Sequence, residues 1–340
     1  MKVFKLHIPI KIFLAIVILF CISSAKCQSS KSISNKDRYR IAEAIRINNK
    51  YGDAIWPGIS KTPFAIILVT DSEEYLINHP KPSDDFHFLN YNTLLKTNIY
   101  VRQRIFPKEL LATFPAVNGV NCVVIGTAEN TQKGSADWII TLLHEHFHQF
   151  EYTYPDYYQQ VTALNLAKGD NTGGWMLNYA FPYNSVPVEQ QFSVYKKALL
   201  NAVKSINSSH FKEKFKIYDM ERQKFKDLLS PDDYRYFSFQ VWQEGIARYT
   251  EYKFLMQLHN DPPSDYFIAL QDSLSLSSYM DVFYKGQLHK LETEKLSSEK
   301  RSNFYAVGFA EGLLLDKINP AWRKNFLTDK FYIEHYFTKQ

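Results

Sequence analysis

The sequence is poor in cysteine, glycine and net charge, and each scarcity excludes a class of protein. Its 340 residues include 3 Cys, 12 Gly and 14 Pro. So little glycine and proline excludes a collagen-like or low-complexity chain. The formal net charge is +5, but four lysines lie in the first 27 residues, which contain no Asp or Glu, and the rest of the chain is close to neutral. We therefore expect no basic face for nucleic acid.

The first 27 residues have the pattern of an export signal. Lysines flank an apolar run from Ile12 to Ile22, and the small residues Ala25 and Cys27 precede Gln28. The run is shorter than the roughly 20 residues that a membrane-spanning helix needs. We therefore predict a signal peptide at residues 1–27 and a secreted or periplasmic mature protein without stable membrane insertion. An uncleaved amino-terminal anchor is the alternative.

Removal of that segment would leave Cys122 as the one cysteine of the mature chain. A single thiol makes no intramolecular disulfide and no zinc–thiolate site. Because Cys122 begins the apolar run Cys122-Val-Val-Ile, we predict a buried, unreactive thiol and no nucleophile here.

What the chain does have is a change of pattern near Gly134. Before it, β-branched and aromatic stretches predict strands, and after it helical periodicity dominates. The fold class is therefore α+β, with one domain at 28–340 that consists of a sheet-containing lobe at 28–134 and a mostly helical lobe at 135–340. The expected strands are 64–70, 99–106 and 122–126, with turns at 79–85 and 115–121; the expected helices are 35–50, 135–152, 187–206, 210–229, 232–258 and 303–318.

One short segment carries the strongest chemical signal, the pattern His144-Glu145-x-x-His148. On a helix that begins with Ser135 as its N-cap, residues four apart lie about 40° apart, so both imidazoles can reach one metal ion. Glu145 then lies beside that ion, where a base acting on water must be. His146 lies about 200° from His144 around the helix and is expected to be a structural or surface histidine. A surface helix that happens to carry three histidines is the alternative.

Two histidines leave a catalytic zinc ion one protein ligand short, and Glu244 is the candidate for the third. It lies in the middle of an expected helix, and the small Gly245 and Ala247 after it would let another helix approach closely. An exposed helical glutamate is the alternative reading of Glu244. Glu251 lies on the same face and is expected either to orient a ligand imidazole or to pair with Arg248.

Together, the segments 144–149 and 244–252 resemble those of gluzincin metallopeptidases, and the second is similar to the matching stretch of M1 aminopeptidases and peptidase-MA-like proteins. The resemblance implies that 28–340 is one catalytic domain of zincin-like fold, with the active-site cleft between its two lobes. It also implies Zn²⁺ held by His144, His148 and Glu244, Glu145 as general base, and a peptide or protein substrate. The chain departs from the M1 pattern in its long spacer between His148 and Glu244. It also lacks a Gly-x-Met-Glu-Asn segment, which captures a free amino terminus in that family.

A third and weaker block, 303–312, contains Tyr305. Related gluzincins place a tyrosine on a late helix, and the resemblance implies that Tyr305 donates a hydrogen bond to the oxyanion of the reaction; Tyr249 is the reserve candidate. In the same architecture, the strand near 122–126 would pair with an extended substrate backbone.

The sequence therefore predicts a secreted zinc-dependent metallohydrolase that cleaves amide bonds. Two alternatives stay open: an exported binding protein of the same fold without turnover, and a gluzincin that acts on a non-peptide bond. The aromatic stretch from Trp175 to Tyr183 either lines a groove for peptide or sugar or packs ordinarily.

Overall fold

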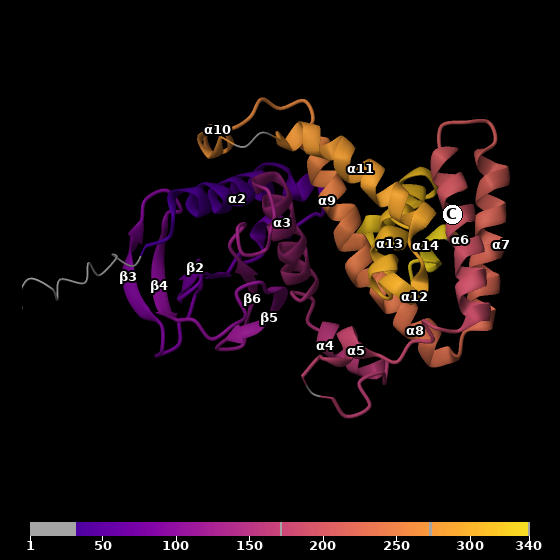
Figure 1. The fold of residues 1–340 in the computed structure, drawn as a ribbon, viewed down its shortest axis with the longest axis horizontal. Coiled ribbons are helices and arrows are strands. Elements are labelled where there is room, and N and C mark those ends of the chain that lie inside the picture. The colour runs from indigo at the N-terminus through magenta and orange to yellow at the C-terminus, as the bar shows by residue number, and fades with distance from the viewer. Residues whose placement is uncertain (1–31, 171, 272–273, 339–340) are drawn as a thin grey trace, which may run out of the picture. The chain divides into compact units, whose positions relative to one another are not determined.

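The computed structural model describes residues 32–170, 172–271 and 274–338 (Figure 1). The predicted signal peptide at 1–27 lies outside these ranges. The chain divides at Ser34, and Asn35–Gln340 forms one compact unit that holds the elements described below. Within the described ranges, none of the helices combines the length and apolarity needed to cross a membrane.

Six strands of the described chain form one mixed sheet in the order β3-β4-β2-β1-β6-β5. β1 and β6 are parallel, and every other neighbouring pair is antiparallel. The strands are β1 (Ile66–Val69), β2 (Glu73–Ile77), β3 (His87–Asn92), β4 (Thr97–Gln103), β5 (Leu111–Val117) and β6 (Val120–Gly126). The sequence predicted β1, β4 and β6, and it missed β2, β3 and β5.

The centre of the sheet is apolar on both faces, as expected for strands covered on both sides. All four residues of β1 are buried. Cys122 is fully buried in a cluster with Ile67, Leu76 and Val124. Burial raises the pKa of its thiol to about 12, which agrees with the prediction of an unreactive cysteine.

Residues 115–121, which the sequence predicted to be a turn, include the end of β5 and the start of β6. Pro115 lies inside β5, and the β5–β6 pairing is irregular between Phe114 and Val117. A proline has no N–H to donate, so it is tolerated on an edge strand or at a bulge, and β5 is such an edge. β6 pairs with β1 on one side and β5 on the other. The expectation that β6 pairs with a substrate backbone is therefore wrong, because its backbone groups are already used.

After Gly126 the described chain is helical or irregular. The α3 helix (Ser135–Glu151) contacts β5, β6 and α2 (Asn35–Ile55) on one side and α9 (Ile246–Leu258) on the other (Figure 1). The other helical segments are η1 (Ile59–Lys61), α4 (Tyr157–Ala163), α5 (Trp175–Asn178), α6 (Val186–Lys204), α7 (Phe211–Leu228), α8 (Pro231–Gln240), η2 (Val241–Gly245), α10 (Asp265–Leu270), α11 (Leu276–Thr293), α12 (Leu296–Glu299), α13 (Ser302–Ile318), η3 (Trp322–Lys324) and α14 (His335–Thr338).

The expected helices are present, with two corrections. The helix expected at 232–258 is three segments, α8, the π-helical turn η2 and α9. α8 begins where its sequence indicates, because the Ser230 side chain accepts the backbone N–H of Asp233. Ser135, by contrast, is not the N-cap of α3: Gly134 is, and the Ser135 hydroxyl accepts a hydrogen bond of 2.8 Å from Arg40 Nε on α2.

The aromatic stretch 175–183 packs against the helices. Tyr179 stacks on Tyr236 of α8 at 4.4 Å between ring centroids, and Phe181 lies 5.4 Å from Phe304 of α13. Trp175 lies 5.3 Å from Phe239. These contacts support the reading of this stretch as ordinary packing.

Candidate metal centre

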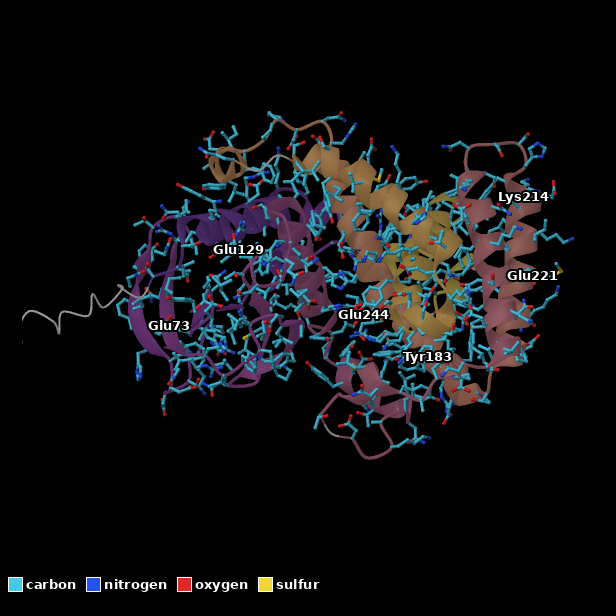
Figure 2. All side chains as sticks on the ribbon, viewed as in Figure 1. Glu73, Glu129, Tyr183, Lys214, Glu221 and Glu244 are labelled. Atoms are coloured by element: carbon cyan, nitrogen blue, oxygen red, sulfur yellow. The ribbon has the colours of Figure 1, made fainter. Side chains whose placement is uncertain are left out.

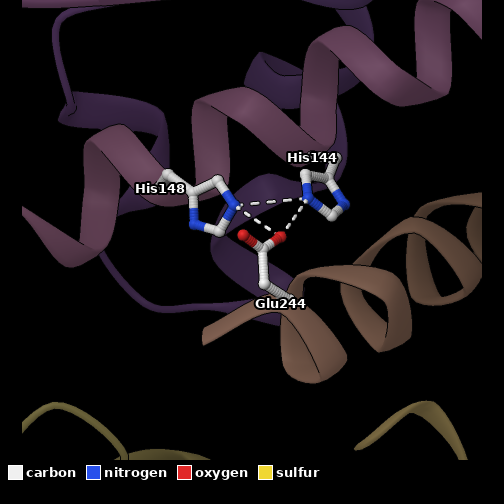
Figure 3. A group of neighbouring side chains, drawn as sticks. All are labelled: His144, His148 and Glu244. Atoms are coloured by element: carbon white, nitrogen blue, oxygen red, sulfur yellow. Dashed lines mark hydrogen bonds and ion pairs between the residues drawn. The ribbon is translucent and has the colours of Figure 1, made fainter. Parts of the chain in front are cut away.

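Three candidate ligands come from two helical segments that are distant in the sequence. His144 and His148 project from one face of α3, and Glu244 projects from η2 opposite them (Figure 3). Figure 2 places Glu244 between the strand-bearing part of the chain and the later helices. Both histidines are buried, and the Glu244 side chain is 17% exposed. Glu244 is therefore not the exposed helical residue of the alternative reading.

The ligand atoms of these residues converge on one point. The two histidine Nε2 atoms lie 3.2 Å apart, and Glu244 Oε2 lies 3.4 Å from His144 Nε2 and 3.6 Å from His148 Nε2. Among the residues that the structure describes, this is the one group of three or more His, Cys, Asp and Glu side chains arranged to hold a metal ion.

A close helix contact holds Glu244 in place. A Cβ atom added to Gly245 would lie only 2.5 Å from the Gly308 Cα of α13, so both positions need glycine. The π-helical turn that contains Glu244 lies at this contact, and such turns are frequent at functional sites. Gly245, the small residue after Glu244, thus lets another helix approach closely, as the sequence predicted.

The other ring nitrogen of each histidine is held by a carboxylate. His144 Nδ1 lies 2.6 Å from Glu251 Oε1, and His148 Nδ1 lies 2.7 Å from Glu151 Oε2. These contacts fix the orientation of both rings and leave both Nε2 atoms facing Glu244. Glu251 also lies 2.9 Å from Arg248 Nη1, so both contacts predicted for Glu251 are present.

The charged groups of the cluster shift one another's pKa values. Burial opposes charge on His148, but the hydrogen bond to Glu151 and the facing Glu244 carboxylate raise its pKa well above the ordinary value. Burial likewise opposes charge on Glu244, yet the two imidazoles that face it hold its pKa well below the ordinary value. Protonated imidazoles would balance the negative charge of these carboxylates. A divalent cation would balance the same carboxylate charge while the imidazoles stay neutral.

Glu145 lies on α3 directly after His144, and its carboxylate is held from the edge of the sheet. The Thr113 hydroxyl of β5 is 2.8 Å from Glu145 Oε2 and 2.9 Å from the Glu145 backbone oxygen. The Glu145 side chain is buried. Its orientation is therefore fixed from β5, at the position directly after the candidate ligand His144 on α3.

Tyr305 lies next to two of the three candidate ligands, His144 and Glu244. Its ring stacks on that of His144, with 6.2 Å between centroids, and its hydroxyl accepts a 3.0 Å hydrogen bond from Arg301 Nη1. Burial and the nearby Glu244 carboxylate raise the pKa of Tyr305 well above the ordinary value, which keeps the hydroxyl proton available for donation.

The reserve candidate, Tyr249, lies elsewhere. Its hydroxyl is 2.7 Å from Asp316 Oδ1, and its ring is fully buried against Gly312. The Tyr249 side chain is therefore part of the core. His146 is also fully buried: it stacks on Phe64 at 3.8 Å, which agrees with the structural reading and excludes the surface one.

Sequence reasoning missed three residues of the site: Glu151, Thr113 and Arg301. Glu151 had a local signal, because it follows His148 by one helical turn and a carboxylate so placed can reach the imidazole. Thr113 and Arg301 carry no such signal, since only the packing of β5 and α13 brings them to α3 and η2.

Comparisons with known proteins identify no family for this chain. No protein-family model matches it, and no curated protein and no solved structure shows significant similarity to it. The arrangement of the candidate site is therefore the basis on which a function is proposed.

Proposed function

We propose that the protein is an exported zinc metallopeptidase of the gluzincin type, which hydrolyses amide bonds in peptides or proteins. In this proposal the sheet and helices form a zincin-like arrangement, with a substrate cleft between the two lobes. The observation that supports it most directly is the convergence of His144, His148 and Glu244, because the sequence alone gave no guarantee that residues so far apart would meet.

The donor set suits zinc. Two imidazole nitrogens and one carboxylate oxygen are a common protein ligand set of catalytic zinc, which leaves the fourth position open. Ligand atoms at about 2.0–2.1 Å from a tetrahedral ion lie about 3.3 Å from one another. The three observed separations, 3.2, 3.4 and 3.6 Å, agree with that value.

A zinc ion held here would supply a Lewis acid and lower the pKa of water. In the proposed reaction, the Glu145 carboxylate accepts a proton from the attacking water and passes it to the leaving amine. Thr113 holds that carboxylate in position. The Tyr305 hydroxyl, supported by Arg301, donates a hydrogen bond to the oxygen on which negative charge develops.

Glu145→Gln tests the proposal. Glutamine keeps the size and an oxygen for Thr113 but has no useful basicity. We expect the variant to retain its zinc, as measured by elemental analysis, and to lose about 10²–10⁴-fold or more of peptide hydrolysis against a quenched-fluorescence peptide library. Glu109→Gln, which removes an exposed carboxylate, is the matched control. It should leave the zinc content and the rate of peptide hydrolysis unchanged.

Three outcomes separate the alternatives. Unchanged turnover in zinc-loaded Glu145→Gln would place the base elsewhere. A protein that takes up no zinc even after reconstitution would contradict the proposal as a whole. Zinc uptake without cleavage of any peptide would favour an exported binding protein or a gluzincin that acts on a non-peptide bond.

A further inference from the structure

Arg301 is a cation beside the candidate metal centre with only a loose carboxylate partner. It precedes α13, and its side chain is 27% exposed. Nη1 lies 3.8 Å from Glu244 Oε1, beyond hydrogen-bond distance. The nearby Arg248, in contrast, lies 2.9 Å from Glu251, and the buried Arg222 lies 2.8 Å from Glu311.

Most of the hydrogen-bonding capacity of Arg301 is unused. A guanidinium has five N–H donors in a planar fork. Within the described ranges of the chain, the Arg301 side chain makes one hydrogen bond, from Nη1 to the Tyr305 hydroxyl. None of the described residues supplies an acceptor for the donors on Nη2 and Nε, and the side chain is partly exposed to solvent.

The position of Arg301 places any anion that it binds close to the reacting bond. Tyr305, its hydrogen-bond partner, stacks on the ligand His144. Glu244, the carboxylate nearest to Arg301, belongs to the ligand group itself. A cation bound by Glu244 would balance that carboxylate and leave the guanidinium to attract an external anion.

We propose that Arg301 binds a carboxylate of the substrate, so that the enzyme prefers peptides with a negative charge within a residue or two of the bond that it cleaves. This inference rests on the proposed peptidase function. Arginine suits the role because its fork matches the two oxygens of a carboxylate. The carboxylate comes either from a peptide's own carboxyl terminus or from an Asp or Glu side chain.

Paired peptide mixtures test the proposal by equilibrium binding. Zinc-loaded Glu145→Gln protein serves as the host, so that peptides bind without turnover, and fluorescence anisotropy reports affinity. The first pair differs only in a free or amidated carboxyl terminus. Both members of the second pair are amidated. One member contains Asp and Glu, and the other contains Asn and Gln in their place. We expect the charged member of at least one pair to bind about tenfold tighter or more, and the pair that responds identifies the source.

Variants of Arg301 assign that preference to this side chain. Arg301→Gln should remove the preference, and Arg301→Lys, which keeps the charge but not the planar fork, should retain part of it. Lys300→Gln removes the same charge one residue away, from an exposed side chain, and should leave the preference intact. Zinc content and the thermal midpoint of each variant are measured alongside.

Equal affinity within both pairs, no binding of either member, or a preference that survives Arg301→Gln would overturn the inference. If the wild-type protein still binds zinc and cleaves neutral, amidated peptides, the peptidase proposal stands and only the role of Arg301 falls. A protein that binds no zinc, in contrast, would contradict the proposed peptidase function itself, on which this inference rests.

Discussion

At the scale of single residues, the candidate ligands depend on the carboxylates behind them. Glu151 reaches His148 from the same helix, whereas Glu251 reaches His144 from α9 across the packed interface. Both carboxylates are buried. A carboxylate that accepts from Nδ1 fixes the ring and increases the basicity of Nε2, which strengthens metal binding.

We therefore expect Glu251→Gln to weaken zinc affinity about 10–100-fold, with a similar loss for Glu151→Gln. Competition with a chromophoric chelator measures the affinity. Glu292→Gln, at an exposed position of α11, should bind zinc as tightly as the wild type. Wild-type affinity in both buried variants would show that these carboxylates do not support the ligands.

At the scale of elements, the crossing of η2 and α13 determines where Glu244 lies. The two backbones approach so closely at Gly245 and Gly308 that neither position has room for a methyl group. α13 also carries Tyr305. One contact between two small residues thus positions a ligand and a candidate oxyanion donor together.

Gly308→Ala should therefore lower stability by about 1–3 kcal/mol, the usual effect of overpacking a core, and should weaken zinc binding as η2 shifts. Thermal unfolding and the zinc titration measure the two effects. Gly286→Ala on α11 is the control, since no atom lies within 4 Å of its added Cβ; it should stabilise the helix by up to about 1 kcal/mol. A Gly308→Ala protein as stable as the wild type would argue against a tight crossing.

At the scale of the whole molecule, the sheet and the later helices have different roles. The sheet forms an apolar core around β1 and β6 and presents Thr113 from its β5 edge, whereas the helices supply Glu244, Glu251 and Tyr305. α3 lies between β5 and β6 on one side and α9 on the other. The site thus depends on the packing of both parts against one helix.

The thiol of Cys122 offers a probe of that global fold. Because burial raises its pKa to about 12, and β6 is covered by its neighbours, alkylation should require unfolding. We expect iodoacetamide at pH 8 to leave Cys122 unmodified under native conditions and to modify it fully in denaturant, as read by mass spectrometry of the Cys122 peptide. Rapid native modification would mean that β6 opens locally, without loss of the rest of the fold.

The sequence by itself determined the elements whose signals are local. Helical periodicity predicted α3, α6, α7 and α13, and the one-turn spacing of His144 and His148 predicted two imidazoles on one face. β3 and β5 gave no such signal, since polar residues and Pro115 are tolerated at the two edges of a sheet. The 18-residue α11 was likewise missed.

Only the tertiary structure decided what meets the α3 histidines. The contacts of Glu244, Glu251 and Tyr305 with α3 depend on how two helices cross, and helix crossing is set by the packing of many side chains and not by spacing along the chain. The same holds for Thr113 and Arg301. The local sequence was enough to predict that His144 and His148 share one face of α3, because a helix fixes neighbours one turn apart. The residues that reach them from other elements do so only once the core has folded.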